Sequence, residues 1–283
     1  MKLAFLFPGQ GARNVLGALQ FARSLRLPLP FRGEGVPSLS EVEARGGRAL
    51  ERTEVLQPVL TAISLSIHAA LVHAGVKPAL ALGHSVGELA AFAAAGVFSP
   101  EDAVRLAAIR GALMAREAAK HPGGLLAMPS LEAANAVLHH GLQLAAINAP
   151  DEVVVSGPEA ALRRAGGKRV PVSGAWHSDA MAGAVEEFRK ALSSLPLPAG
   201  ERVGERALLR SADPQSLADD LVTPVHFSAA LHAAVARGID TFITVGPGLV
   251  LRGLVRRNLG TTVKVLTTED AADFDRTVVE ATR

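Results

Sequence analysis

Residues 83–87, Gly-His-Ser-Val-Gly, are the part of this sequence best suited to covalent chemistry. A short apolar run at 79–83 leads into them, and an alanine-rich helix is expected over 86–95, so Ser85 would stand in a tight turn between strand and helix. The glycines would prevent collisions there, and the free N–H groups of the helix start would face a developing oxyanion. The pattern favours a serine nucleophile. The same residues are also consistent with a glycine-rich turn in which the serine only caps the helix.

A serine hydroxyl is a weak nucleophile and requires a general base. His177 is a candidate because it lies where a small inserted domain is expected to end, and clefts form where domains meet. His84 adjoins the serine, but its side chain should point away from that of Ser85. The other histidines considered lie in an apolar helix, at helix ends or in loops: His68, His73, His121, His139 and His140.

Arg110 lies on a helix expected over residues 100–120, on the same side as Ala103, Ala107 and Met114. An arginine turned toward an apolar face requires a carboxylate partner. Its planar guanidinium suits a bidentate grip on a carboxylate, either of a substrate or of Glu117 in a structural ion pair.

Alternating strands and helices at both ends of the chain would position these residues. Such alternation predicts a largely parallel sheet with helices on both faces. Strands are expected at 2–7, 79–83, 207–209, 241–245 and 263–266, and helices at 58–74, 86–95, 100–120, 179–195, 227–237 and from 249 to 258. Residues 12–51 are expected to be irregular, with an exposed loop at 32–35.

The middle of the chain has a different rhythm. Strands at 125–128, 142–147, 153–155 and 169–172 and helices at 131–139 and 159–165 give the order β-α-β-β-α-β, which is ferredoxin-like. The sequence therefore predicts an α/β fold in which a large hydrolase-like parallel-sheet domain, residues 1–122 and 179–283, carries an inserted ferredoxin-like domain, residues 123–178.

Composition excludes several classes of function. The 283 residues include no cysteine, which removes disulfides, thiolate metal sites and a cysteine nucleophile. The formal net charge is +2 and no basic run suits nucleic acid. The N-terminus resembles a first strand rather than a signal peptide, and the apolar stretch 59–74 is interrupted by polar residues, as in a buried helix. The expected location is the cytoplasm, without membrane contact.

Eight motifs follow one another along the chain: Phe7-Pro8-Gly9-Gln10-Gly11, Gln57-Pro58, Gly83-His84-Ser85-Val86-Gly87-Glu88, Val104-Arg105-Leu106 through Arg110-Gly111 and Met114, Asn148-Ala149-Pro150, Trp176-His177-Ser178, Thr223-Pro224-Val225 and Val245-Gly246-Pro247-Gly248. Together they resemble the malonyl-CoA:acyl-carrier-protein transacylase family, which includes the acyltransferase domains of polyketide synthases. The resemblance spans nearly the whole chain. Several ordered motifs are far more specific than Gly-x-Ser-x-Gly alone.

The resemblance implies a ping-pong reaction in which Ser85 takes a malonyl group from malonyl-CoA and passes it to acyl carrier protein. His177 would be the base, oriented by the backbone carbonyl of Asp220 in place of an acid. The oxyanion hole would use the backbone N–H groups of Gln10 and Val86. No cofactor or metal would be needed, since malonyl-CoA is a substrate, and the resemblance implies a monomer in fatty-acid or polyketide synthesis.

Four side chains would contact the substrate by the same resemblance. Arg110 would hold the malonyl carboxylate, and Gln57 would line the site. Asn148 would lie near the acyl or pantetheine chain. Trp176 would restrict the acyl group beside its second carbon, although an anchor between domains would also use a large ring.

The sequence departs from the family at Arg13, where glutamine is commoner, and at 209–213, where an asparagine pair is common. Three other functions compete. An α/β-hydrolase would need Asp102 or Asp151 as its acid, but no histidine follows His232, and its histidine belongs near the C-terminus. An acyl-carrier hydrolase or a malonate decarboxylase subunit would share the family. A non-enzymatic scaffold would not require Ser85, His177 and Arg110.

Overall fold

Strand β1 (Leu3–Phe7) explains why the chain builds layers. All five of its residues are buried; Leu3, Phe5 and Phe7 belong to one apolar cluster, whereas Ala4 and Leu6 belong to another. Successive side chains of a strand point to opposite faces, so a strand that is apolar on both faces must lie between two layers. The computed structural model describes residues 1–27, 30, 42, 46–195, 207–208 and 213–283.

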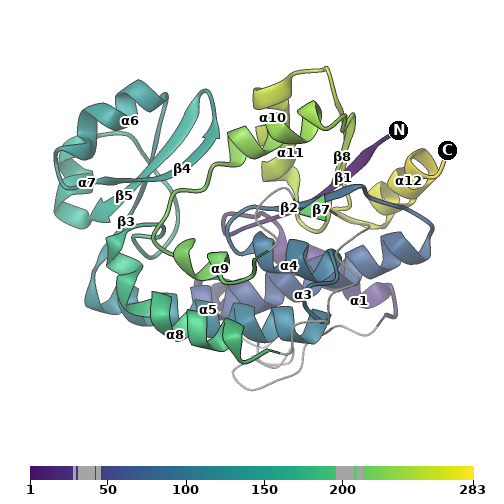
Figure 1. Ribbon diagram of the computed structural model, residues 1–283, viewed down its shortest axis with the longest axis horizontal. Coiled ribbons are helices and arrows are strands. Elements are labelled where there is room, and N and C mark those ends of the chain that lie inside the picture. Colours follow the sequence, from purple (N-terminus) through teal and green to yellow (C-terminus); the bar gives the residue numbers. More distant parts are fainter. Residues whose placement is uncertain (28–29, 31–41, 43–45, 196–206, 209–212) are drawn as a thin grey trace.

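The central sheet is parallel, with the strand order β7-β2-β1-β8-β9. Its other strands are β2 (Leu80–Gly83), β7 (Ala207–Leu208), β8 (Thr241–Thr244) and β9 (Lys264–Leu266). Helices cover both faces (Figure 1). The larger apolar cluster, which contains Phe5 and Phe7, packs one face of the sheet against the helices drawn below it in Figure 1. The smaller cluster, which contains Leu6, packs the other face against α10 (Phe227–Ala236) and α11 (Leu249–Leu259).

The remaining helices of this part lie around the same sheet: α1 (Val15–Ser24), η1 (Gly46–Glu51), α3 (Thr53–His73), α4 (Gly87–Ala94), α5 (Pro100–Lys120), η2 (Asp179–Met181), α8 (Ala182–Ser193), α9 (Ser216–Asp219) and α12 (Ala271–Ala281). Helix α5 begins as its sequence predicts, because the Ser99 hydroxyl accepts a hydrogen bond from the Asp102 N–H and Pro100 follows it. By length and composition, α3 could cross a membrane, but 78% of its apolar stretch is buried, as in a core helix.

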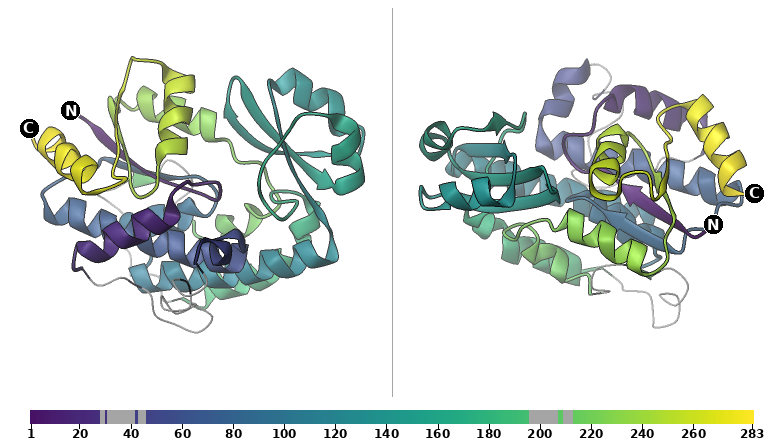
Figure 2. Two further views of the ribbon diagram at one scale, coloured as in Figure 1. Left: turned by 180° about the vertical axis from the view of Figure 1, so that it is seen from behind. Right: turned by 90° about the horizontal axis from the view of Figure 1, so that it is seen from above.

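A second sheet is antiparallel, with the order β4-β5-β3-β6. It consists of β3 (Gly123–Met128), β4 (Gln143–Ala149), β5 (Glu152–Pro158) and β6 (Lys168–Arg169), and it carries α6 (Leu131–Leu138) and α7 (Glu159–Ala165) on one face (Figure 2). Its other face packs toward the large sheet's core through Leu125 and Val154. The expected fold class, a parallel α/β part with a ferredoxin-like second sheet, is confirmed; the boundaries at 122 and 178 stay a prediction.

Strand β4, at the edge of the small sheet, is joined to a backbone segment of the large part. Ala146 of β4 forms a parallel bridge with Val225, with hydrogen bonds of 2.8 Å from Ile147 N to Val225 O and 2.9 Å from Val225 N to Ala145 O. The edge of the small sheet is thus fixed to a backbone segment of the large part.

Several expected elements differ from the structure. Helix α1 occupies part of the stretch expected to be irregular, because Val15, Ala18, Leu19 and Ala22 recur at helical spacing and are buried. Helix α12 begins at an Asp270 cap that the sequence reading had not considered. The strand expected at 169–172 is only Lys168–Arg169, and the valines after it line a cavity. The loop expected at 32–35 and the departure at 209–212 lie outside the described residues.

Candidate active site

Ser85 stands between β2 and α4 with a left-handed backbone, φ 54°. Such a conformation is uncommon for a residue with a side chain and is typical of a serine presented at a sharp strand-to-helix turn. The turn lies against the end of β1, where His84 N donates to Phe7 O at 3.0 Å. A Cβ on Gly87 would come within 2.2 Å of Phe7 O, and one on Gly9 within 2.3 Å of His84 O. The glycines therefore allow two backbone segments to touch.

His177 holds the Ser85 hydroxyl. Its Nδ1 lies 2.7 Å from the Asp220 carbonyl oxygen and 3.2 Å from that of Thr223. Carbonyls only accept hydrogen bonds, so Nδ1 carries the proton and Nε2 is left as an acceptor. The Ser85 hydroxyl donates to this Nε2 at 2.9 Å. The geometry suits proton removal from the serine, with two backbone carbonyls in the place of an acid.

Burial, followed by the positive charge of Arg110, lowers the pKa of His177 to about 3, although the hydrogen bond to the Asp220 carbonyl opposes the shift. Only the neutral imidazole can accept the serine proton. Because the neutral form predominates above the pKa, His177 is ready to act throughout the neutral and mildly acidic range.

The rate at which a fluorophosphonate labels Ser85 should accordingly change by less than about twofold between pH 5 and pH 8. If the base had the ordinary histidine pKa of about 6.5, the labelling rate would fall to about half of its maximum at pH 6.5. Mass spectrometry of the labelled protein measures this rate, with circular dichroism at each pH to verify folding. A midpoint near pH 6.5 would contradict the lowered pKa of His177.

Arg110 is buried beside the nucleophile. Its NH1 donates to Gln57 Oε1 at 2.8 Å and its NH2 to Ser85 Oγ at 3.2 Å. Burial lowers the pKa of Arg110 to about 10, against the opposing charge of Asp220, so the guanidinium remains charged at neutral pH. No ion pair holds Arg110 among the residues that the structure describes; Glu117, the alternative partner, pairs with Arg116 and Lys120 instead.

A polar network supports this arginine. Gln57, which is fully buried, donates to Thr53 Oγ1 at 2.8 Å and approaches Gln10 Oε1 at 3.4 Å. The Thr53 hydroxyl also donates to Gln10 Oε1, at 3.0 Å. The sequence reading missed Thr53, although its spacing of four residues before Gln57 on α3 places both on one helix face.

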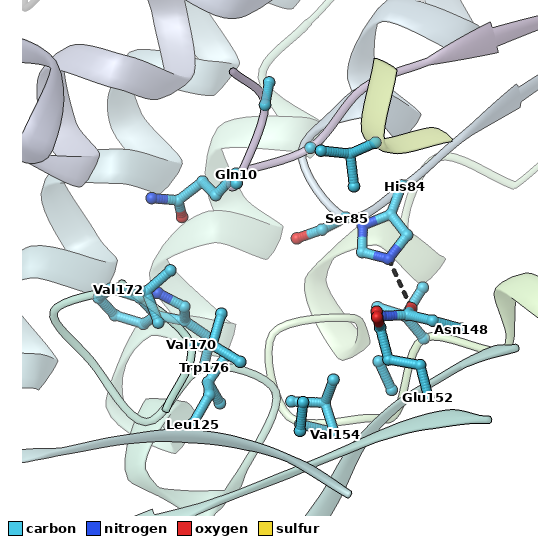
Figure 3. Close-up of a pocket in the computed structure, with 18 of the residues that line it drawn as sticks. Gln10, His84, Ser85, Leu125, Asn148, Glu152, Val154, Val170, Val172 and Trp176 are labelled. Carbon is cyan, nitrogen blue, oxygen red and sulfur yellow. Dashed lines mark hydrogen bonds between the residues drawn. The ribbon is translucent and has the colours of Figure 1, made fainter. Parts of the chain in front are cut away.

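A cavity of about 500 Å³ opens in front of Ser85. The turn at Gln10, the segment with Trp176 and His177, and one face of the small sheet line it; Figure 3 shows Leu125, Val154, Val170 and Val172 on its apolar side. Trp176 is buried and lies so close over Gly174 that a Cβ there would come within 2.2 Å of the indole. Asn148 also lines the cavity, and its Oδ1 accepts from His84 Nε2 at 2.8 Å.

Of the expected site residues, five line the cavity: Gln10, Ser85, Asn148, Trp176 and His177. Gln57, Arg110 and the carbonyl of Asp220 do not line it but are joined to those residues by hydrogen bonds. Val86, whose N–H is expected in the oxyanion hole, directly follows the nucleophile and is the N-cap residue of helix α4. The acids of the hydrolase alternative lie elsewhere, since Asp102 bonds to Ser99 and Arg105, and Asp151 pairs with Arg257. Within the described ranges, no group of three or more metal-binding side chains is present.

Comparisons with known proteins give matches over most of the chain. Residues 37–273 match the family model of the acyl transferase domain. The chain is similar to the malonyl CoA-acyl carrier protein transacylase of Bacillus subtilis, with 30% identity over 285 residues and 90% of each chain covered. It is 35% identical over 298 residues to the spectinabilin polyketide synthase system protein NorB of Streptomyces orinoci, covering 90% of this chain and 13% of that protein. An acyl-carrier-protein S-malonyltransferase structure from Bartonella henselae matches with a TM-score of 0.85 and 27% identity over the whole of both chains.

Proposed function

Because this chain belongs to the acyl transferase family, we propose that it transfers a malonyl group from malonyl-CoA to the phosphopantetheine thiol of acyl carrier protein through a malonyl ester of Ser85. The observation that carries the choice of malonyl is Arg110. A buried guanidinium with no ion-pair partner among the described residues, 3.2 Å from Ser85 Oγ, is suited to a substrate carboxylate.

In the first half-reaction, Ser85 Oγ attacks the thioester carbonyl as its proton moves to His177 Nε2. The backbone N–H groups of Gln10 and Val86 would stabilise the oxyanion. The carbon–sulfur bond then breaks, and the CoA sulfur takes the proton from His177. In the second half, the carrier's thiol gives its proton to His177 and attacks the ester, and Ser85 Oγ leaves with that proton.

Incubation with labelled malonyl-CoA, with and without carrier protein, tests the proposal. The label should remain on the protein in the absence of carrier and move to the carrier when it is added. Release of free malonate at the same rate in both samples would instead indicate the hydrolase of the same family, and absence of label would contradict malonyl transfer. The proposal includes a monomer in the cytoplasm, with no cofactor beyond the substrates.

Arg110→Ala should lower kcat/KM for malonyl-CoA by about 100-fold, equivalent to about 2.7 kcal/mol, because a buried charge-assisted pair with the carboxylate is lost. Acetyl-CoA has no carboxylate and should be affected by less than about threefold. Steady-state kinetics with both substrates measure the difference. Arg105→Ala, on the same helix but bonded to Asp102 at the surface, is the control. Equal losses for both substrates would make Arg110 structural.

Trp176→Ser should raise the preference for methylmalonyl-CoA over malonyl-CoA by about tenfold, equivalent to about 1.4 kcal/mol. The indole lines the cavity, and an extra methyl beside it would overpack a fitted site at a cost of about 1–3 kcal/mol. Competition between the two substrates measures the ratio, and a melting temperature separates the alternative. A lower melting temperature with an unchanged ratio would show that Trp176 is an anchor between the two sheets.

A further inference from the structure

His84 precedes the nucleophile, but its ring points away from the Ser85 hydroxyl and toward the small sheet (Figure 3). Its Nε2 donates to Asn148 Oδ1 at 2.8 Å, across 64 residues of sequence. The ring also packs edge-on against Phe227 of α10, with 5.2 Å between centroids. A single side chain thus connects the nucleophile turn to the end of β4.

The partner of His84 is itself held from two sides. The Asn148 amide donates to Glu152 Oε1 at 2.9 Å, and Glu152 Oε2 accepts from Arg257 at 2.8 Å. The Asn148 carbonyl accepts from Asn258 Nδ2 at 2.8 Å. Arg257 and Asn258 both belong to α11 of the large part, so Asn148 is fixed in relation to both sheets.

The His84 ring also lies against Gly9, next to Gln10, whose backbone N–H is expected to form part of the oxyanion hole. A Cβ on Gly9 would lie 3.0 Å from His84 Nδ1, so the ring is in contact with the residue before Gln10. Burial lowers the pKa of His84, which favours the neutral ring. Asn148 Oδ1 can only accept a hydrogen bond, so the N–H of that ring lies on Nε2. A positive charge on His84 would further lower the pKa of His177.

We propose that His84 and Asn148 form a clamp that positions Ser85 and Gln10, and that Asn148 acts through His84 rather than by binding the acyl group. Asn148 lines the cavity, as expected for a substrate contact, but its amide is already bonded to His84 and Glu152. The two roles differ in what they predict: a positioning residue affects every reaction of Ser85, whereas a substrate contact affects only reactions with that substrate.

Labelling of Ser85 by a small fluorophosphonate, in the intact protein without CoA or carrier, tests the clamp separately from the proposed malonyl transfer on which its role rests. Asn148→Ala and His84→Met, which lack the bond, should each slow labelling by about tenfold, as for loss of one aligned contact. The double variant should be no slower than the slower single variant, because both remove the same bond. His84→Gln, whose Nε2 can replace that of the imidazole, should stay within about threefold of the parent.

Gln143→Ala is the matched control. Gln143 lies on the same strand and donates to Asp179 of η2 at 2.6 Å, but it has no hydrogen bond to His84 among the described residues. Its loss should leave labelling unchanged. Equal slowing in Gln143→Ala would mean that any loosening of the sheets has this effect, and would overturn the clamp.

Kinetics with malonyl-CoA provide the second readout. Asn148→Ala should lower kcat by the same factor as labelling, with KM changed by less than about twofold. Normal labelling with a raised KM would make Asn148 a substrate contact and would overturn the proposal. The proposal would also be overturned if the rate losses of His84→Met and Asn148→Ala multiplied in the double variant, because the two residues would then act independently. If His84→Met fails to fold, the comparison of Asn148→Ala with Gln143→Ala decides the question alone.

Discussion

Ser85→Ala is expected to abolish the covalent malonyl form of the protein. The Ser85 hydroxyl is the group that His177 holds at 2.9 Å and Arg110 at 3.2 Å, and removing its oxygen removes the atom that would form the ester. Intact-protein mass spectrometry after mixing with malonyl-CoA measures the adduct. The expected spectrum of the parent shows one added malonyl group, and that of the variant shows none.

Ser173→Ala provides the control, because Ser173 is an exposed serine near the cavity-lining valines. It should keep the full adduct. A full adduct in Ser85→Ala would show that another residue is the nucleophile, since the methyl group that replaces the hydroxymethyl group has no lone pair with which to attack.

His177→Ala is expected to slow transfer by about 10³-fold or more, because a base and a nucleophile act as a unit. The variant loses the Nε2 acceptor for the serine proton and the Nδ1 link to the Asp220 carbonyl. Single-turnover formation of the adduct measures the loss without interference from the carrier. A loss of less than about tenfold would assign the base elsewhere.

Asp220→Ala is the matched variant for the same contact. The bond to His177 comes from the Asp220 backbone, so the variant should keep most of its activity. A loss as large as that of His177→Ala would mean that the Asp220 carboxylate acts as a true acid in a triad, and would favour a hydrolase-type mechanism.

Local patterns revealed the nucleophile and Arg110. The turn at Ser85 is encoded by adjacent residues, and Arg110 could be assigned to the inner side of α5 from helical periodicity. By contrast, the carbonyl of Asp220 was expected only from the resemblance. The carbonyl of Thr223 was not expected at all, because every residue has a main-chain carbonyl and the residue type does not show which one contacts a histidine.

The contacts of Asn148 lay beyond sequence reasoning for a different reason. His84, Glu152 and Asn258 approach it from three separate elements, and no spacing within any one of them encodes the meeting. The sequence could predict that Asn148 lies near the cavity but not that its amide is already engaged. Helix α1 was also not expected, although Val15, Ala18, Leu19 and Ala22 recur at helical spacing.

The bridge between Ala146 and Val225 bears on how a long substrate enters. Val225 lies two residues after Thr223, whose carbonyl contacts His177, so any swing of the small sheet would pull on the base itself. If the small sheet opened and closed as a lid in each turnover, the movement would therefore disturb the hydrogen bond between His177 and Ser85 each time. The bridge therefore favours an entrance of fixed width, through which the flexible pantetheine arm of the proposed substrates would pass.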